Sequence, residues 1–340
     1  DLVALGTVCD VMPLTGLNRA LVSQGLKILK QRKNAGIRAL FDVADLDCVY
    51  LSYDEPNKEE FWVKIQNMVP WAKRVDSVQG SDAAHKAAAA ASDTERFILI
   101  DGDNMPFSEF FDLTLDIEDN YKDCVFRWKA INTINGLMYG NGGMSCWTRT
   151  FVNNMRTHEA SDGTDENDVE FCYDPKYLAM NNVYSTTYPN GSAKHAWRAG
   201  FREGVKMCLR NGTKPTLPEF EDMVHKSNFD RLSMWHNVGR DAEHGTHAIN
   251  GARMGTYMTM LTDWDHTEVQ WFENLDRIYT EYDTMNMPEI NGALMTRLGL
   301  PMLDIGVKES AFFKKYYAQT YCPAAPMSLE MDMIRKHEGW

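Results

Sequence analysis

Short apolar runs alternate with longer amphipathic stretches between residues 47 and 104. The runs predict strands at 48–53, 72–78 and 97–100, and the amphipathic stretches predict helices at 59–68 and 81–91. Residues 97–100 are apolar on both faces and too few for a helix, which predicts a buried central strand. Right-handed crossovers would set the three strands parallel. The chain is therefore expected to be an α/β protein with a Rossmann-type nucleotide-binding sheet.

Two aspartates follow the predicted central strand directly. Asp101 and Asp103 flank Gly102, which adds no side-chain bulk and lets the backbone turn so that both carboxylates face one point. Ligands of open α/β sheets bind beyond the carboxyl ends of the strands, and paired carboxylates suit Mg²⁺ or Mn²⁺ that carries a diphosphate. We therefore predict Asp101 and Asp103 as metal ligands. The alternative is a plain turn, since every residue of Asp-Gly-Asp-Asn is a turn former.

Polar side chains also follow the first predicted strand, in the loop 53–57. In a parallel sheet this loop and residues 101–104 open on the same edge, so we expect a nucleotide beside the acidic pair. Lys86 could reach a phosphate from the alanine-rich helix, or it could be a solvated surface lysine. The further residues predicted to bind the nucleotide are Tyr53, Asp54, Glu55, Asn57, Lys86 and Asn104. The glycine motifs of P-loop enzymes and dinucleotide-binding dehydrogenases are absent after the strands, which argues against those two functions.

A glycine-rich stretch, 139–143, follows a further strand predicted at 124–128. Its three glycines lie between Tyr139 and Trp147, and they predict a tight loop with aromatic walls. A flat, hydroxyl-rich ligand could approach the backbone of such a loop closely. Tyr139, Gly142 and Gly143 are therefore candidate ligand contacts. A β-bulge or a hairpin is the alternative interpretation of the same pattern.

An acidic run, 158–170, supplies the candidates for a catalytic base. Most of the run must be solvated, because a buried cluster of like charges would not stay ionised. Asp168 and Glu170 stand just before the apolar residues Phe171 and Tyr173, so either one could act as the general base for an acceptor hydroxyl. The pattern does not decide between these two neighbours.

Three cations recur at a spacing of four residues in the helix predicted at 196–206. Arg198, Arg202 and Lys206 would therefore share one helical face. That face could bind phosphate or a polyanionic acceptor. The alternative is that these residues form surface ion pairs of little energetic value.

Two histidines are candidates for a nitrogen ligand beside the acidic pair. His236 or His247 could complete the metal site opened by Asp101 and Asp103, or could be an ordinary hydrogen-bonded residue. Small residues at 249–255 predict a helix that can pack closely against a neighbour.

Composition limits the range of functions. The net charge of −13 argues against broad attachment to nucleic acid or to anionic membranes. The seven cysteines are scattered and odd in number, which favours a reduced, cytoplasmic setting over a disulfide framework. No apolar run approaches the roughly 18 residues of a membrane span. The sequence opens on Asp1 rather than Met, so we expect the true start, with any targeting segment, to lie upstream.

Residues 1–44 differ in pattern from the rest of the chain and resemble RecJ-type single-strand exonucleases of the DHH phosphoesterase family. The resemblance is carried by GTVCDVMPL at 6–14, by Asn18-Arg19 and by Gly25-Leu26. It implies that Asp10 descends from a metal ligand. The Asp-His-His triplet that defines the family is absent from the sequence, and one ligand cannot hold two Mn²⁺ ions. We therefore expect an incomplete, non-catalytic fragment without nuclease activity.

Residues 47–260 resemble phage-encoded glycosyltransferases of the GT-A class. The resemblance is carried by five segments together: 53–57, 83–86, 101–104, 135–143 and 198–206. It implies a nucleotide-sugar donor, with Asp101 and Asp103 as the Asp-x-Asp motif that binds Mn²⁺ or Mg²⁺ and the diphosphate. It also implies an acceptor hydroxyl, with a hydroxymethylated base of phage DNA among the candidates, and hence a place in the host cytoplasm.

The sequence is thus interpreted as three parts: a RecJ-like fragment at 1–44, a GT-A-like domain at 45–260, and an extension of helices and loops at 261–340 packed on it. The C-terminal part of the fold is expected to be of mixed α+β type. The predicted function is metal-dependent sugar transfer. A metal-dependent nucleotidyltransferase would use the same acids and release pyrophosphate, and a non-enzymatic sugar- or nucleotide-binding module would bind without turnover. No membrane and no protein partner is inferred.

Overall fold

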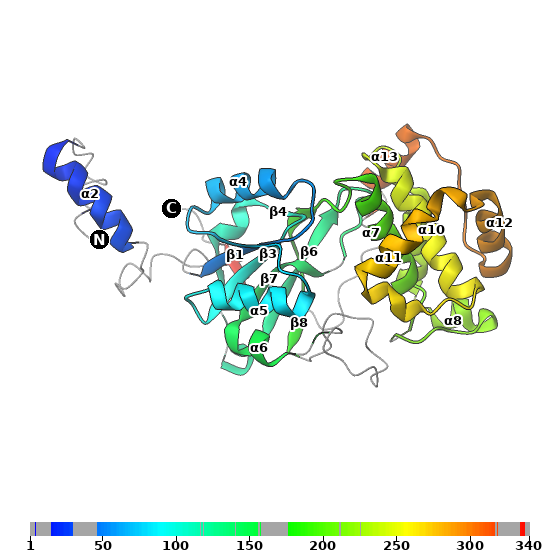
Figure 1. Ribbon diagram of the computed structural model, residues 1–340, viewed down its shortest axis with the longest axis horizontal. Helices are drawn as coiled ribbons and strands as arrows, with labels where there is room; N and C mark the ends of the chain where they lie inside the picture. Colours follow the sequence, from blue (N-terminus) through cyan, green and yellow to red (C-terminus); the bar gives the residue numbers. More distant parts are fainter. Residues whose placement is uncertain are drawn as a thin grey trace.

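The computed structural model describes residues 4, 15–29, 46–115, 117, 119–139, 141–155, 157, 176–210, 212–224, 226–316, 318 and 334–336. Within these ranges the protein is of mixed α/β type, with a sheet on one side and a group of helices on the other (Figure 1). Helix α2 (Gly16–Leu29) lies apart from both, at the left of the same view. Asp10 lies outside the described residues.

The main sheet has seven strands in the order β2-β1-β3-β7-β6-β8-β4. As predicted, β1 pairs in parallel with both β2 and β3, so the first half is a parallel β-α-β-α-β unit. The second half is mixed, because β7 runs antiparallel to β3 and β6, whereas β6 and β8 are parallel. The strands are β1 (Asp47–Ser52), β2 (Lys73–Asp76), β3 (Arg96–Asp101), β4 (Asn104–Pro106), β6 (Val125–Asn132), β7 (Asn141–Thr148) and β8 (Tyr177–Thr187).

The short link between β3 and β4 requires the sheet to curl. Only Gly102 and Asp103 separate the two strands, yet β4 pairs with β8 at the far edge of the sheet. Three strands, β7, β6 and β8, therefore bend round between the end of β3 and the start of β4. Asp103 lies at this corner, where the central strand and the edge strand meet.

Two helices bury the opposite faces of β1 and β3. Helix α4 (Lys58–Met68) packs Phe61 and Ile65 with Tyr50, Ile98 and Ile100. On the other face, α5 (Ser81–Ala91) packs its alanines with Val49, Phe97 and Leu99. Successive side chains of a strand point to opposite faces, so this double cover explains why 97–100 is apolar throughout.

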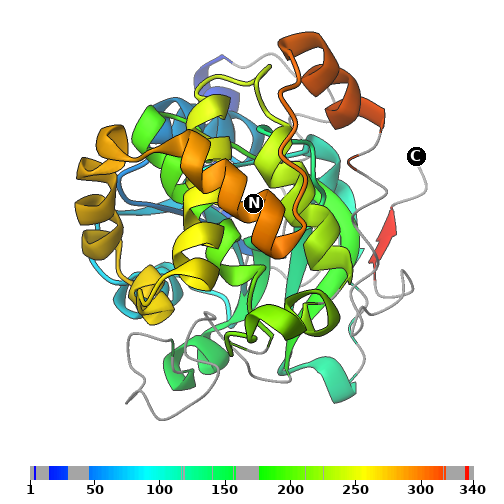
Figure 2. The same ribbon diagram turned by 90° about the vertical axis from the view of Figure 1, so that its right-hand side faces the viewer.

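The helical part packs around a second core that also includes Ile134 and Leu137 from the β6–β7 connection. This core contains Trp197 and Phe201 as well as Leu275 and Leu294, so it includes residues on both sides of position 260. Figure 2 looks onto this group of helices from the right-hand side of Figure 1. Its helices are α7 (Ala193–Lys206), α8 (Phe220–Met223), α9 (Lys226–Asn237), α10 (Gly245–Leu261), α11 (Phe272–Thr280), α12 (Met287–Leu298) and α13 (Val307–Tyr316).

Smaller elements complete the fold. Helix α6 (Arg149–Asn154) follows β7, and its Phe151 and Val152 join the core on the α5 face of the sheet. Strands β5 (Leu113–Leu115) and β9 (Ile334–Lys336) form a separate antiparallel pair. Among the described residues, no helix is long and apolar enough to cross a membrane. The four cysteines within those ranges, Cys48, Cys124, Cys146 and Cys208, are buried, and none of them forms a disulfide with another.

Glycines bring the backbones of α7 and α10 into direct contact. A Cβ added at Gly200 would lie 1.9 Å from the carbonyl oxygen of Ala248, and one at Gly251 would lie 2.1 Å from that of Trp197. Gly204 and Gly255 repeat the pattern one turn further along each helix, at 2.2 Å. This confirms the close packing predicted for 249–255, and it sets how far α7 stands from the rest of the helical core.

Gly200→Ala is expected to destabilise the protein by more than about 2 kcal/mol, because the new methyl group can only be accommodated if the two helices move apart. Gly292→Ala is the matched control: Gly292 lies inside α12 with nothing within 4 Å of its added Cβ. There the exchange should be neutral or stabilise by up to about 1 kcal/mol, since alanine favours helix. Chemical denaturation measures both, and an equal effect of the two substitutions would refute the packing argument.

Candidate functional site

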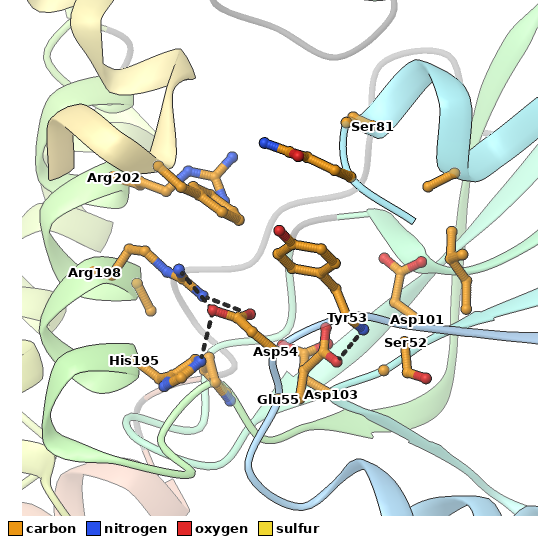
Figure 3. A pocket seen from close by; sticks show the side chains of 18 of the residues that line it. Ser52, Tyr53, Asp54, Glu55, Ser81, Asp101, Asp103, His195, Arg198 and Arg202 are labelled. Atoms are coloured by element: carbon orange, nitrogen blue, oxygen red, sulfur yellow. Dashed lines mark hydrogen bonds and ion pairs between the residues drawn. The ribbon is translucent and has the colours of Figure 1, made fainter. Parts of the chain in front are cut away.

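A pocket of about 510 Å³ opens at the carboxyl ends of β1 and β3, between the sheet and the helical part. As predicted, the loops that follow these two strands meet there, and they contribute residues 53–56 and 101–103 to its lining. The opposite side is formed by α7 and by residues 269–273. Figure 3 shows the labelled side chains of α7 on one side, Asp101 and Ser52 on the other, and Tyr53 standing between them.

Three carboxylates form the acidic wall of the pocket: Glu55, Asp101 and Asp103. Burial raises the pKa of Asp101 well above its ordinary value, and repulsion from Asp103 and Glu55 adds to the shift. Burial likewise raises the pKa of Glu55 and of Asp103. Among the described residues no group donates a hydrogen bond to the Asp101 carboxylate. The acidic wall is therefore poised to accept a cation or protons.

Asp103 is held in place by two side chains. The Thr187 hydroxyl donates to its Oδ2 at 3.0 Å, and the Asn104 amide donates to its Oδ1 at 2.9 Å. Asn104 is itself buried and accepts a hydrogen bond from Ser185 at 3.0 Å. Both Thr187 and Ser185 belong to β8, so the curl of the sheet brings the support for Asp103 to the end of β3.

Gly102 allows a close approach of Glu55 and does not adopt an unusual backbone conformation. It is not among the glycines with positive φ, but a Cβ at this position would lie 2.4 Å from Oε2 of Glu55. The Tyr50 hydroxyl donates a hydrogen bond to the Gly102 carbonyl at 2.7 Å. The Glu55 carboxylate, which accepts from the Tyr53 amide at 2.7 Å, can thus lie directly against the Asp101–Asp103 turn.

The opposite wall is basic and comes from α7, the helix that Ser192 caps by accepting from the His195 amide at 3.2 Å. Arg198 contacts both carboxylate oxygens of Asp54 at 3.3 Å, and His195 Nε2 lies 3.4 Å from the same carboxylate. Hydrogen bonding to His195 and then to Arg198 outweighs burial and holds the pKa of Asp54 well below its usual range. Figure 3 shows these contacts bridging the two walls.

The start of α5 closes the pocket from a third direction. Gly80, with φ of 90°, precedes the helix and provides no side-chain cap for its first amide groups. Residues 79–81 line the pocket. The dipole of a helix makes its N-terminal end favourable for an anion.

The donor set fits a divalent cation that also binds phosphate. In the part of the chain that the structure describes, no three His, Cys, Asp or Glu residues lie close enough to hold a metal by themselves. Mg²⁺ sites typically combine one or two carboxylates with substrate phosphates and waters, so Asp101 and Asp103 can supply the protein's share. Arginines across the pocket can neutralise the remaining phosphate charge.

His236 does not complete this site, and that prediction is wrong. The imidazole is fully buried in the helical part, with Nε2 3.0 Å from the Thr256 hydroxyl. Burial and the nearby Arg253 charge lower the pKa of His236 to about 3, so it is a neutral core residue. Neither His236 nor His247 lines the pocket.

The predicted glycine loop is largely a strand. Gly142 and Gly143 belong to β7, which forms a hairpin with β6, so the alternative interpretation is the correct one. Gly143 has a supporting role: a Cβ there would lie 2.0 Å from the Asn104 amide nitrogen. Tyr139 is also not in the pocket, because its hydroxyl is hydrogen-bonded to Glu203 and accepts from Trp235 in the helical core.

Three other predicted binding residues stand outside the pocket lining. Asn57 precedes α4, and Lys86 pairs with Asp82 one turn earlier on α5 at 2.6 Å, as expected for a surface lysine. Asn104 acts on the site indirectly, through Asp103. The candidate bases Asp168 and Glu170 lie outside the described residues.

Sequence reasoning missed His195 and the aromatic pair Trp271 and Phe272, which all line the pocket. His195 precedes Arg198 by three residues, so the shared helical face could have revealed it. Phe272 lies under Arg198, with the guanidinium carbon 4.0 Å from the ring centre. No motif marks residues 269–273, and only tertiary packing brings them to the site.

Asp101→Asn is expected to stabilise the metal-free protein at neutral pH. A carboxyl group with a raised folded-state pKa contributes stability below its ordinary pKa and loses it as the pH rises through the raised value, so Asp101 lowers the stability of the folded state at pH 7 relative to a neutral side chain. The melting temperature should rise by roughly 2 °C or more at pH 7, and the gain should vanish below about pH 4, where both states are protonated. Scanning fluorimetry with a chelator present measures this. Asp123→Asn, at an exposed pair with Lys176, should change little; a lower melting temperature for Asp101→Asn at pH 7 would contradict the repulsion argument.

The comparisons with known proteins identify one short similarity. The single-stranded-DNA-specific exonuclease RecJ of Dickeya dadantii (strain 3937) is 54% identical over 52 residues, and that of Escherichia coli (strain K12) is 49% identical over 53 residues. Each match covers 15% of this chain and 9% of the relative's length. No protein-family model and no solved structure matches the chain. The RecJ resemblance is thus confirmed for a short segment, whereas the resemblance to glycosyltransferases stays a prediction.

Proposed function

We propose that this protein is a metal-dependent glycosyltransferase that binds a nucleotide-sugar donor in the pocket at the end of β3, on a GT-A-like sheet. The observation that carries the proposal is that an acidic wall and a basic wall face each other across one pocket. Asp101 and Asp103 stand on one side, and Arg198 and Arg202 stand on the other, within one pocket of about 510 Å³. A metal-bound diphosphate has the charge distribution that such walls complement.

Each group of pocket residues would have a separate role in the reaction. Asp101 and Asp103 would hold Mn²⁺ or Mg²⁺, which when bound would neutralise charge that builds on the departing diphosphate. Thr187 and Asn104 keep Asp103 oriented for this. Arg198 and Arg202 would donate to phosphate oxygens, and Tyr53, which is 40% exposed, would contact the base or ribose of the donor.

The parallel half of the sheet supports the same proposal. Nucleotides bind open α/β sheets at the carboxyl ends of parallel strands, and here the ends of β1 and β3 both line the pocket. The start of α5 adds a favourable position for a phosphate. A nucleotidyltransferase would use the same walls, and the two reactions differ in their products: sugar transfer releases a nucleoside phosphate, whereas nucleotidyl transfer releases pyrophosphate.

Nucleotide sugars are expected to raise the melting temperature only when Mn²⁺ or Mg²⁺ is present. A ligand at 100 times its dissociation constant stabilises by about 2.7 kcal/mol, which a thermal-shift screen detects readily. Asp103→Asn should abolish the metal-dependent part, and Asp123→Asn, remote from the pocket, should retain it. The proposal fails if no nucleotide sugar stabilises the protein in a metal-dependent way, or if the stabilising nucleotide is consumed with release of pyrophosphate.

A further inference from the structure

Arg198 is a pre-positioned cation at the inner surface of the pocket. Only 9% of the residue is exposed, and its guanidinium stacks on the Phe272 ring at 4.0 Å. The stacking fixes the plane of the Arg198 guanidinium. Both Arg198 and Arg202 line the pocket. We call the paired N–H donors of the Arg198 guanidinium its fork. A largely buried cation needs an anionic partner, since the loss of water around it is otherwise uncompensated.

Asp54 is the anionic partner of Arg198 in this structure, but its contacts with Arg198 are long. Both of its contacts with Arg198 measure 3.3 Å, and the contact with His195 measures 3.4 Å. Charge-assisted pairs of this kind normally measure about 2.7–2.9 Å. The same protein contains such a pair: Arg74 binds both oxygens of Glu59 at 2.8 and 2.7 Å. The Arg198 fork is therefore not closed tightly on Asp54.

Asp54 also lies where solvent and an external anion can reach it. Its side chain is 37% exposed, and it belongs to the loop between β1 and α4 rather than to either element. Its neighbour Glu55, by contrast, accepts a hydrogen bond from the backbone amide of Tyr53 and packs against Gly102. The contacts that lower the pKa of Asp54 are screened by solvent at this exposure, so an external anion can compete with Asp54 for the same fork.

We propose that His195, Arg198 and Arg202 form a phosphate site, and that Asp54 occupies this site in place of phosphate until a ligand displaces it. The ligand class is a phosphate ester or a diphosphate, and binding at this wall requires no metal, because the cations of α7 supply the charge. That the anion is the diphosphate of a nucleotide sugar rests on the proposed function, but the existence of the phosphate site does not. The acidic groups that oppose the anion are Asp54, Glu55, Asp101, Asp103 and Glu273, which all line the pocket.

If Asp54 competes with the anion, removal of the Asp54 charge should strengthen anion binding. Asp54→Asn is expected to raise the affinity for inorganic pyrophosphate by about threefold or more, because the pair it competes with has the strength of a partly exposed ion pair. Arg198→Gln should lower the affinity by about tenfold or more. Asp276→Asn is the matched control. Asp276, in α11, pairs at 3.0 Å with Lys194 of α7, the helix that carries Arg198, but it does not line the pocket. It removes the same charge and should leave pyrophosphate binding unchanged.

Isothermal titration calorimetry of the full chain with pyrophosphate, in the presence of a chelator, measures these affinities, and thermal unfolding verifies that each variant is folded. If Arg198→Gln does not fold, Arg198→Lys keeps the charge without the planar fork and should still weaken binding. Affinity that is equal or lower in Asp54→Asn overturns the proposal, as does an equal gain in Asp276→Asn or the absence of pyrophosphate binding in every protein. The expected pattern, combined with a failed nucleotide-sugar screen, would retain the phosphate site and reject sugar transfer.

Discussion

The candidate site depends on three carboxylates that the fold buries together at the end of β3. Burial raises the pKa of Asp101, Asp103 and Glu55, and repulsion from neighbouring carboxylates adds to the shift for Asp101 and Glu55, so the arrangement is costly when it is empty and ionised. The fold maintains it by fixed contacts around the acids: the Tyr50 hydroxyl holds Gly102, and Thr187 and Asn104 hold Asp103. Buried carboxylates with raised pKa values that surrounding contacts hold in a cleft are a common feature of binding sites.

The basic wall is positioned by a different part of the molecule. Arg198 and His195 belong to α7, and the place of α7 is set by its glycine-mediated contact with α10 on the side away from the sheet. The separation of the two walls therefore depends on helix packing as much as on the strands. Asp54 is the direct link across this gap, since it extends from the β1 loop to both α7 residues.

The short motifs that carry the RecJ resemblance, at 6–14, 18–19 and 25–26, include no residue of the pocket lining. The residues that carry the RecJ resemblance end before residue 27, whereas the main sheet begins at Asp47. The similarity covers 15% of this chain and 9% of the RecJ proteins, so their exonuclease activity does not transfer to the pocket residues. The function of the pocket is inferred from its own geometry and charge.

Local sequence determined the parallel half of the sheet and the place of the acids. The double-sided apolar run at 97–100, the Asp-Gly-Asp that ends it, and the loop at 53–55 were sufficient, because strand burial and parallel crossover follow from short-range pattern and chain handedness. The cationic face of α7 was also visible, since residues four apart share one side of a helix.

Only the tertiary structure decided what those residues face. His236 and Tyr139 have side chains suited to a binding site, yet packing places them in the helical core, and Gly143 proved to make room for Asn104 inside a strand. Conversely, Phe272 carries no motif and comes to lie under Arg198 across 74 positions of sequence. Burial and long-range contact depend on how the two cores meet and on how the sheet curls, and neither is encoded within a window short enough to read along the chain.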